Sequence, residues 1–297
     1  MKKMLLFVNP AAGREEMHLQ LMDVISRFTG AGYDVTCHPT QKPGDIPQVI
    51  ADRGETFDMI VTCGGDGTLN ETVTGLMQLR KRPLLGYIPA GTVNDFATSL
   101  HIPKTIPEAV DNLIEGRPFS VDLGGFNEKY FTYVAAFGAF TKVSYATPHA
   151  SKQALGRAAY ILEGIRSLTD IRPIHVTAHV GDQVIEDDVI LGMITNATSV
   201  GGFKALDDSI VKMDDGLNEL ILVRAPKGLP DYNAIVGAVI ARDFRPDHFI
   251  ILQADSVTLD FDEPVSWTLD GEYGGDTDHA LVVNIPKPIE IMVPQGD

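Results

Sequence analysis

The sequence predicts a two-domain protein: an N-terminal α/β domain with a parallel sheet over residues 1–118, and a mostly antiparallel β-sandwich domain over residues 119–297. The length of 297 residues exceeds that of one average domain. Before residue 118, short apolar runs alternate with helical patterns, which favours a parallel sheet covered by helices on both faces. After it, short strands of alternating polar and apolar residues dominate, which favours antiparallel sheets.

The N-terminal domain begins with a strand and then alternates helices with strands. In the first helix, Leu19, Met22, Ile25 and Phe28 form one apolar stripe. The expected strands are residues 4–8, 33–38, 59–63 and 84–88, and the expected helices are residues 15–28, 46–53, 69–79 and 106–115. Because ligands of such sheets bind at the carboxyl ends of the strands, the loops after these strands are the first candidates for a site.

The C-terminal domain is predicted as a series of short strands, interrupted by helices at residues 152–168 and 231–241. Polar and apolar residues alternate most clearly in residues 257–261. The expected strands are residues 121–124, 131–136, 174–180, 184–195, 219–223, 249–252, 256–261, 266–269 and 280–284. A last strand, at about residues 288–294, could return to the first domain.

Composition restricts the partners and the compartment. With 24 Lys and Arg against 40 Asp and Glu, the formal net charge is −16, so nucleic acid is not an expected partner. An anionic bilayer would also repel this surface on average, so any membrane contact is expected to be local and mostly apolar. The two cysteines, Cys37 and Cys63, form no CxxC pair, which fits the reducing cytoplasm.

A glycine-rich turn, Gly64-Gly65-Asp66-Gly67-Thr68, directly follows the apolar run that ends at Cys63 and precedes a helical pattern. Glycines let a backbone turn tightly and approach a ligand, and a helix N-terminus presents N–H groups to an anion. Asp66 would repel a phosphate there unless a metal or a proton donor intervenes. The turn therefore indicates either chemistry on phosphate or an ordinary strand–helix connection.

Two further small-residue loops follow predicted strands of the same sheet. Asn9-Pro10-Ala11-Ala12-Gly13 precedes Arg14, which could meet a phosphate. The loop at residues 89–95 offers Thr92 and Asn94 as neutral donors, and Asn94 or Asp95 could cap the following helix. Each loop alone could be a plain connection. Turns after neighbouring parallel strands would nevertheless face one crevice.

Two acidic turns in the C-terminal domain could carry chemistry. Asp270 and Glu272 flank one glycine, and near a phosphate either could be the general base for a hydroxyl. The segment from Lys212 to Leu217 includes Asp214 and Asp215 and could bind a hard cation through carboxylate and backbone oxygens. Both patterns also occur in ordinary solvated turns.

Taken together, these segments resemble the bacterial soluble diacylglycerol kinases and related lipid kinases, over essentially the whole chain. NAD kinases and phosphofructokinases look similar at the Gly-Gly-Asp-Gly-Thr turn alone, so the specificity lies in five segments in this order. The five segments are residues 8–13, 64–70, 89–95, 212–217 and 270–275.

The resemblance implies a Rossmann-like nucleotide domain, akin to that of NAD kinases and phosphofructokinases, with ATP in the interdomain cleft and Mg²⁺ as cofactor. Glu272, with Asp270 beside it, would accept the proton of the lipid hydroxyl, and Asp66 would belong to the catalytic network. A structural Mg²⁺ would bind the main-chain oxygens of Lys212 and Leu217 and the side chain of Asp215, with Asp122 linked to the metal's waters, and a catalytic Mg²⁺ would arrive with ATP. The implied nucleotide contacts are Asn9, Pro10, Ala11, Ala12, Gly13, Thr40, Gly64, Gly65, Asp66, Gly67, Thr68, Leu69, Asn70, Thr92 and Asn94.

The expected function is therefore that of an ATP- and Mg²⁺-dependent kinase that transfers the γ-phosphate to diacylglycerol and makes phosphatidic acid. The alternatives are a kinase of another lipid alcohol, such as a sphingoid base or an isoprenoid alcohol, an NAD kinase, or a catalytically silent nucleotide-binding regulator. The resemblance implies a membrane-lipid substrate, a cytoplasmic protein with peripheral contact at the inner membrane face, and a homodimer. A local basic patch for that contact could come from Lys142, Lys152, Arg157, Arg166 and Lys204.

Overall fold

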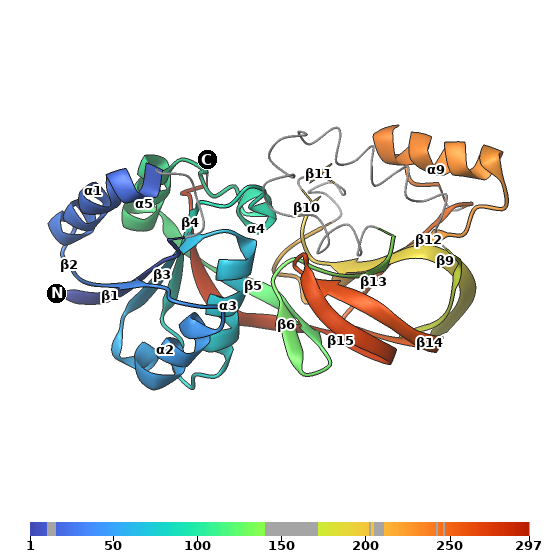
Figure 1. Ribbon diagram of the computed structural model, residues 1–297, viewed down its shortest axis with the longest axis horizontal. Helices are drawn as coiled ribbons and strands as arrows, with labels where there is room; N and C mark the ends of the chain where they lie inside the picture. Colours follow the sequence, from blue (N-terminus) through green and yellow to red (C-terminus); the bar gives the residue numbers. More distant parts are fainter. Residues whose placement is uncertain are drawn as a thin grey trace. The chain divides into compact units, whose positions relative to one another are not determined.

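The computed structural model describes residues 1–10, 16–139, 172–201, 203–204, 211–241, 243–245 and 247–296 (Figure 1). By its internal contacts the chain divides into two units. The first consists of Met1–Asp122 together with Pro286–Asp297, and the second consists of Leu123–Ile285. Among the described residues, no helix has both the length and the apolar character needed to cross a lipid bilayer.

Parallel strands form the centre of the first unit. The strands β1 (Lys2–Val8), β2 (Tyr33–Pro39), β3 (Met59–Gly64) and β4 (Leu84–Pro89) pair in the order β4-β3-β1-β2, and every pair is parallel. The end of β15 (Glu272–Val293) adds to this sheet, because Ile291 pairs in parallel with Leu85 of β4. The last strand therefore returns to the first unit.

Helices cover both faces of this sheet (Figure 1). On one face α1 (Glu16–Gly30) and α5 (Ile106–Glu115) pack on Met4, Leu6 and Val8 of β1. On the other face α2 (Asp45–Arg53) and α3 (Asp66–Met77) lie against each other. Burial on both faces explains why β1 and β3 are continuous apolar runs rather than alternating ones. The 3-10 turn η1 (Gly54–Thr56) and the short α4 (Asp95–Ser99) complete the unit.

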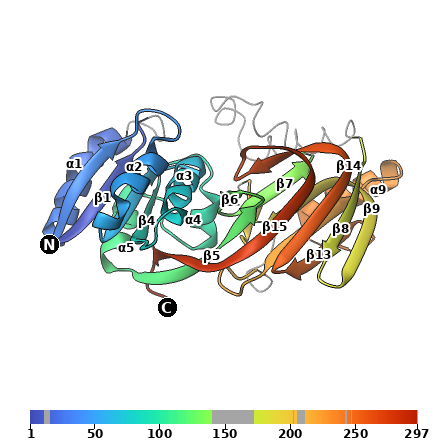
Figure 2. The same cartoon turned by 90° about the horizontal axis from the view of Figure 1, so that it is seen from below.

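Antiparallel strands build the second unit. The strands β7 (Val134–Gly138), β8 (Ile174–Val180), β9 (Gln183–Thr195) and β14 (Ser256–Leu269) form a closed circuit of pairs. The circuit closes because β9 and β14 are long: each pairs with β8 along one half and with β7 along the other (Figure 2). The pairing continues from β9 through β12 (Asn218–Arg224) to β13 (Phe249–Ala254).

The smaller elements of the second unit flank these strands. The strand β5 (Arg117–Phe126) begins in the first unit and pairs with β6 (Lys129–Phe131). A two-stranded ribbon consists of β10 (Ser199–Val200) and β11 (Phe203–Lys204). The helix α9 (Leu229–Ala241) contributes Ile235 to a separate apolar cluster.

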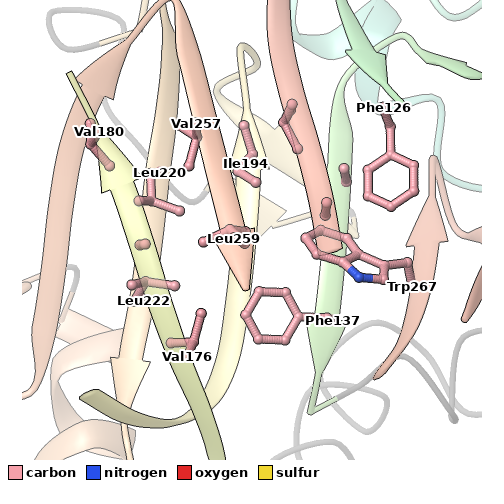
Figure 3. Packing of buried hydrophobic residues seen from close by; sticks show 14 of the residues in the cluster. Phe126, Phe137, Val176, Val180, Ile194, Leu220, Leu222, Val257, Leu259 and Trp267 are labelled. Atoms are coloured by element: carbon pink, nitrogen blue, oxygen red, sulfur yellow. The ribbon is translucent and has the colours of Figure 1, made fainter. Parts of the chain in front are cut away.

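An aromatic cluster centred on Trp267 fills the core of the second unit (Figure 3). The Trp267 ring lies 4.7 Å from the Phe126 ring and 4.8 Å from the Phe137 ring, measured between centroids. Aliphatic side chains from β8, β12 and β14 pack around these rings, including Leu220 and Leu259. Tilted aromatic pairs of this kind add about 1 kcal/mol each beyond the apolar area that they bury.

The predicted sequence of an α/β part followed by mostly antiparallel strands is confirmed. Two pairs of predicted strands merge, because 256–261 and 266–269 both belong to β14 and the strand near 288–294 is the end of β15. The predicted strand 131–136 is wrong as one element, because Thr132 and Tyr133 separate β6 from β7. Their N–H groups bind a carboxylate instead of a neighbouring strand. The predicted helix 152–168 lies outside the described residues.

Candidate active site

The turns after β3 and β4 pack backbone against backbone. A Cβ atom on Gly91 would stand 2.5 Å from the Cα atom of Gly65, closer than real Cβ contacts allow. A Cβ atom on Gly64 would meet the Thr68 hydroxyl at 2.5 Å. The Ala90 N–H donates to the Gly64 carbonyl at 2.8 Å and joins the turns directly. These glycines are therefore required by close approach, since none of the three has a positive φ.

Asp66 holds the second turn in place from the first. Its Oδ2 accepts the backbone N–H groups of Asn94 at 2.9 Å and Asp95 at 3.4 Å, at the start of α4. The expectation that Asn94 or Asp95 caps this helix is corrected, because no side-chain cap bond comes from Asn94. The Asn94 Oδ1 instead accepts the Gly91 N–H at 3.0 Å, and Asn94 adopts a left-handed φ of 57°. The acid that looked misplaced in a phosphate loop is thus an acceptor for the neighbouring turn.

The ends of β1 and β2 join the same edge of the sheet. The Asn9 side-chain amide donates to the Thr68 hydroxyl at 3.1 Å, and the Asn9 N–H donates to the Cys63 carbonyl at 3.2 Å. The Thr40 N–H donates to the Val8 carbonyl at 2.9 Å. Thus the structure brings together the nucleotide contacts expected on all four strands. The expected contacts at Ala11, Ala12 and Gly13 lie outside the described residues.

The carboxyl ends of the parallel strands offer backbone N–H groups that could bind an anion, and the cysteine beside them is not a reactive nucleophile. Gly67 and Thr92 are exposed there, and α3 begins at Asp66. Burial raises the pKa of the Cys63 thiol to about 12, so it stays protonated and unreactive. Burial, with the charge of Asp66, also raises the pKa of Tyr87 well above its usual value. The Tyr87 hydroxyl therefore remains a donor, and it binds the Asn94 Oδ1 at 3.2 Å.

In the second unit, Asp270 is a buried carboxylate surrounded by donors. Its Oδ2 accepts from the N–H of Thr132 at 2.7 Å and from the Thr132 hydroxyl at 2.9 Å. Its Oδ1 accepts from the N–H groups of Tyr133 at 2.9 Å and Val134 at 3.1 Å. Four hydrogen bonds leave this side chain, which is only 5% exposed, little capacity to serve as a base.

Glu272 has the opposite character. It is exposed and begins β15 directly after the turn. The turn residues Asp270 and Gly271 have φ values of 51° and 86°, the signs that a two-residue type I′ hairpin requires. Asp270 therefore anchors the turn through its buried side chain, whereas Glu272, the first residue after the turn, has an exposed side chain.

The segment from Lys212 to Leu217, where the sequence predicts a site for a hard cation, forms a compact turn. The Asp215 Oδ1 accepts the Leu217 N–H at 3.0 Å, and Gly216 provides the positive φ of 81°. The Leu217 carbonyl accepts the Asn284 side-chain amide at 3.0 Å. Among the described residues, no three His, Cys, Asp or Glu side chains surround a common point, so a cation here would rely on backbone carbonyls.

Asp122, the further carboxylate implied by the resemblance, belongs to the first unit, whereas the turn belongs to the second. Asp122 is fully buried, and its Oδ1 accepts the N–H of Lys287 at 2.8 Å, where Lys287 has a left-handed φ of 50°. The observed contact therefore ties β5 to β15. The basic residues expected to form a local patch lie at positions whose side chains are not described.

Sequence reasoning missed one buried acid, Glu219 of β12. It lies two residues after the end of the turn at Leu217, and its side chain is fully buried. Burial raises the pKa of the Glu219 carboxyl to about 7, and the charge of Asp215 adds to the shift. The sequence did carry a signal for it. Glu219 begins the apolar run 219–223, and a buried strand rarely contains an acidic side chain.

Comparison with known proteins places these features in a family. The family model of the diacylglycerol kinase catalytic domain matches residues 3–126. The chain is 34% identical to the diacylglycerol kinase of Bacillus subtilis (strain 168), covering 99% of this chain and 97% of the relative. It is also 34% identical to the diacylglycerol kinase of Staphylococcus carnosus (strain TM300), with 99% and 96% covered.

A solved structure of a diacylglycerol kinase is also similar to this chain over nearly its whole length. The crystal structure of a diacylglycerol kinase from Bacillus anthracis str. Sterne superposes with a TM-score of 0.78 at 25% identity, covering 98% of this chain and 97% of that one. The resemblance predicted from the five segments is confirmed, since similarity extends along the whole length. The chain belongs to the diacylglycerol kinase family.

Proposed function

We propose that this protein is a lipid kinase that transfers the γ-phosphate of ATP to the hydroxyl of diacylglycerol and so makes phosphatidic acid. The observation that carries the proposal is the pair of glycine turns after β3 and β4, joined through Asp66, in a chain of this family. Phosphoryl transfer requires positioning and charge stabilisation more than covalent chemistry, and such a rigid edge of backbone donors serves both.

The first unit would bind the nucleotide, in the manner of Rossmann-like and NAD-kinase-like domains. Gly65 and Gly67 flank the start of α3 at Asp66 and carry no side chains, so phosphate oxygens could reach the first N–H groups of this helix. Exposed Thr92 and Gly67 would contact the nucleotide, and Asn9 and Thr68, which already bind each other, would shape its pocket. Asp66 would act by fixing the second turn.

The second unit would serve the acceptor hydroxyl, as the lipid-kinase domain. Glu272 would accept the hydroxyl proton while the hydroxyl oxygen bonds to the γ-phosphorus and the bond to the β–γ bridging oxygen breaks, which releases ADP. The exposure of Glu272 supports this assignment, because a base must reach the substrate. Asp270 would be a positioning residue, because its four hydrogen bonds hold the turn that presents Glu272.

The donor set of the Lys212–Leu217 turn fits Mg²⁺, a hard cation that takes carboxylate and carbonyl oxygens. Asp215 and the carbonyls of Lys212 and Leu217 would hold it, and the Asn284 amide fixes the Leu217 carbonyl. When bound, this structural Mg²⁺ would stabilise the turn, whereas the positive charge that offsets the phosphates would come from a separate Mg²⁺ that arrives with ATP. Asp122 would contribute through the position of β15.

The substrate also implies a location. Diacylglycerol resides in membranes, so we infer a cytoplasmic protein that contacts the inner membrane face peripherally. The family resemblance is the separate ground on which we propose a homodimer. Flotation with lipid vesicles and light scattering in solution test these two expectations separately.

A lipid panel with labelled ATP tests the proposed activity. Diacylglycerol, a sphingoid base, an isoprenoid alcohol and NAD should be offered in mixed micelles with Mg²⁺, and diacylglycerol should be the preferred acceptor. Glu272→Gln should slow labelling by about 10²–10⁴-fold, whereas Glu263→Gln, a change at an exposed acid of the same unit, should not slow it. If another alcohol were labelled in preference, that alcohol and not diacylglycerol would be the substrate. Normal ATP binding without any labelling would refute the kinase assignment.

A further inference from the structure

Glu219 is a carboxylate with one unused oxygen. It lies on β12 between β9 and β13, where its backbone pairs with Thr195 and Gln253. Its Oε1 accepts the Gln253 side-chain amide at 3.1 Å, whereas its buried Oε2 has no hydrogen-bond partner among the residues that the structure describes. A buried polar atom without a partner is costly and rare in native proteins, so the position calls for an explanation.

The face of β12 that carries Glu219 is the face reached by the start of the Lys212–Leu217 turn. Along β12, Leu220 packs into the Trp267 core, so Glu219 and Ile221 point to the other side. Ile221 packs there against Val211, the residue immediately before the turn. Val211, directly before the turn, and Glu219, two residues after Leu217, therefore lie on the same side of β12, and the turn connects them.

The end of the turn carries further unused polar atoms. Within the described part of the chain, Asn218 Nδ2 and Asn284 Oδ1 are buried without hydrogen-bond partners, although the Asn284 amide donates to both the Leu217 carbonyl and the Asn218 Oδ1. By the alternation along β12, Asn218 lies on the same side as Leu220, so these two amide atoms belong to the other face of the strand and not to the Glu219 side. On the Glu219 side, a hydrated cation at the turn would supply the partner that Oε2 lacks, because the cation and its waters bind carboxylate oxygens.

We propose that Glu219 is a second carboxylate of the cation site on the Lys212–Leu217 turn, acting with Asp215 on a hard divalent cation of the Mg²⁺ kind. The inference rests on the proposed use of that turn as a metal site. Asp215 acts from the exposed side of the turn and Glu219 from the buried side. Affinity for hard cations rises with the number of carboxylate charges that face them, so Glu219 sets how tightly the turn binds.

Nucleotide-free protein titrated with MgCl₂ at pH 8 tests the proposal, with thermal unfolding as the readout of binding. A cation that binds only the folded state stabilises it by RT ln(1 + [Mg²⁺]/Kd), so the rise of Tm with Mg²⁺ concentration reports the Kd. Three variants are compared with the parent chain: Glu219→Gln, Asp215→Asn and the exposed control Glu263→Gln. Glu219→Gln should weaken Mg²⁺ binding on the order of tenfold, as the loss of a carboxylate that supports a metal site does.

The metal-free Tm distinguishes loss of the cation from misfolding. Glutamine keeps the shape and removes a charge that is buried without compensation, so Glu219→Gln should melt no lower than the parent chain without Mg²⁺. A lower metal-free Tm, or parental Mg²⁺ affinity in Glu219→Gln while Asp215→Asn is weakened, would overturn the role of Glu219 and leave the turn as a site. If Glu219→Gln and Asp215→Asn both bound Mg²⁺ as tightly as the parent chain, the turn would not be a metal site, and the role of Glu219 in it would be refuted as well.

Discussion

The Oδ2 atom of Asp66 accepts the backbone N–H of Asn94 at 2.9 Å, across two different strand–helix turns. The same oxygen lies 3.4 Å from the Asp95 nitrogen. One carboxylate from the turn after β3 thus performs the capping role at the start of α4 that local side chains leave open. The geometry of the second turn depends on this acid, which links the stability of the unit to its proposed nucleotide site.

Replacing Asp66 with alanine should lower stability and ATP binding together. The change leaves two N–H groups without their acceptor, at a cost of about 2 kcal/mol in the free energy of unfolding. Urea denaturation and equilibrium ATP binding measure the two effects. Asp52→Ala, at an exposed position on α2, should change neither. Parental ATP affinity in Asp66→Ala would show that the second turn needs no such support.

Replacing Gly91 with alanine should force the two turns apart. The new Cβ would stand 2.5 Å from the Gly65 Cα, and neither backbone can move without shifting its turn. We expect a loss of about 1–3 kcal/mol in stability, as for other overpacked sites, together with weaker ATP binding. Gly30→Ala is the matched control, because nothing lies within 4 Å of its added Cβ and its φ is not positive. Equal behaviour of the two variants would contradict the close-approach argument.

Asp270 and Glu272 should fail in different ways when changed to their amides. Glu272→Gln should lower kcat by about 10²–10⁴-fold, the range for a lost general base, with little change in stability because the side chain is exposed. Asp270→Asn turns an acceptor for four donors into a group with donors of its own, and we expect a loss of about 3 kcal/mol. Chemical denaturation and steady-state kinetics separate the effects. The reverse pattern would exchange the two roles.

Asp45 should make stability depend on pH in the acid range. A hydrogen bond from His38 and another from the Gln41 N–H lower the pKa of Asp45 below its usual value of 3.8. Its ionised form is therefore favoured in the folded state, so its contribution is fully present above pH 3.8 and disappears as the pH falls through the lower folded pKa. Asp45→Asn should be less stable than the parent at pH 7 by about 1 kcal/mol, and urea unfolding at stepwise lower pH should show the difference closing. A constant difference would contradict this account.

Several parts of the fold were predictable because their causes are local. Continuous apolar runs marked the buried strands β1 and β3, and helical periodicity marked α1 and α5. The turn expected at residues 270–272 is present, and the positive φ values of Asp270 and Gly271 make it a two-residue hairpin turn. The glycine-rich site segments were predictable because each is a short local pattern that directly follows a predicted strand.

Other features come from partners that are distant in the sequence. Nothing near Asp270 indicates that its carboxylate is occupied by Thr132 and its two successors, more than 130 residues earlier. Sequence alone therefore left open whether Asp270 or Glu272 was the better base. The strand split at Thr132 has the same cause, because its N–H serves a side chain rather than a strand.

The sequence by itself determined the change from alternating strands and helices to mostly antiparallel strands, the glycine turns and the family, since these depend on residue periodicity and on short segments. Only the tertiary structure decided how the acids are used: Asp66 as the acceptor for another turn, Asp270 as an anchor, Glu219 as a buried acid behind a turn, and β15 as a strand that pairs with β4. The physical reason is that a carboxylate's role depends on which donors and charges surround it, and folding brings these together from distant parts of the chain.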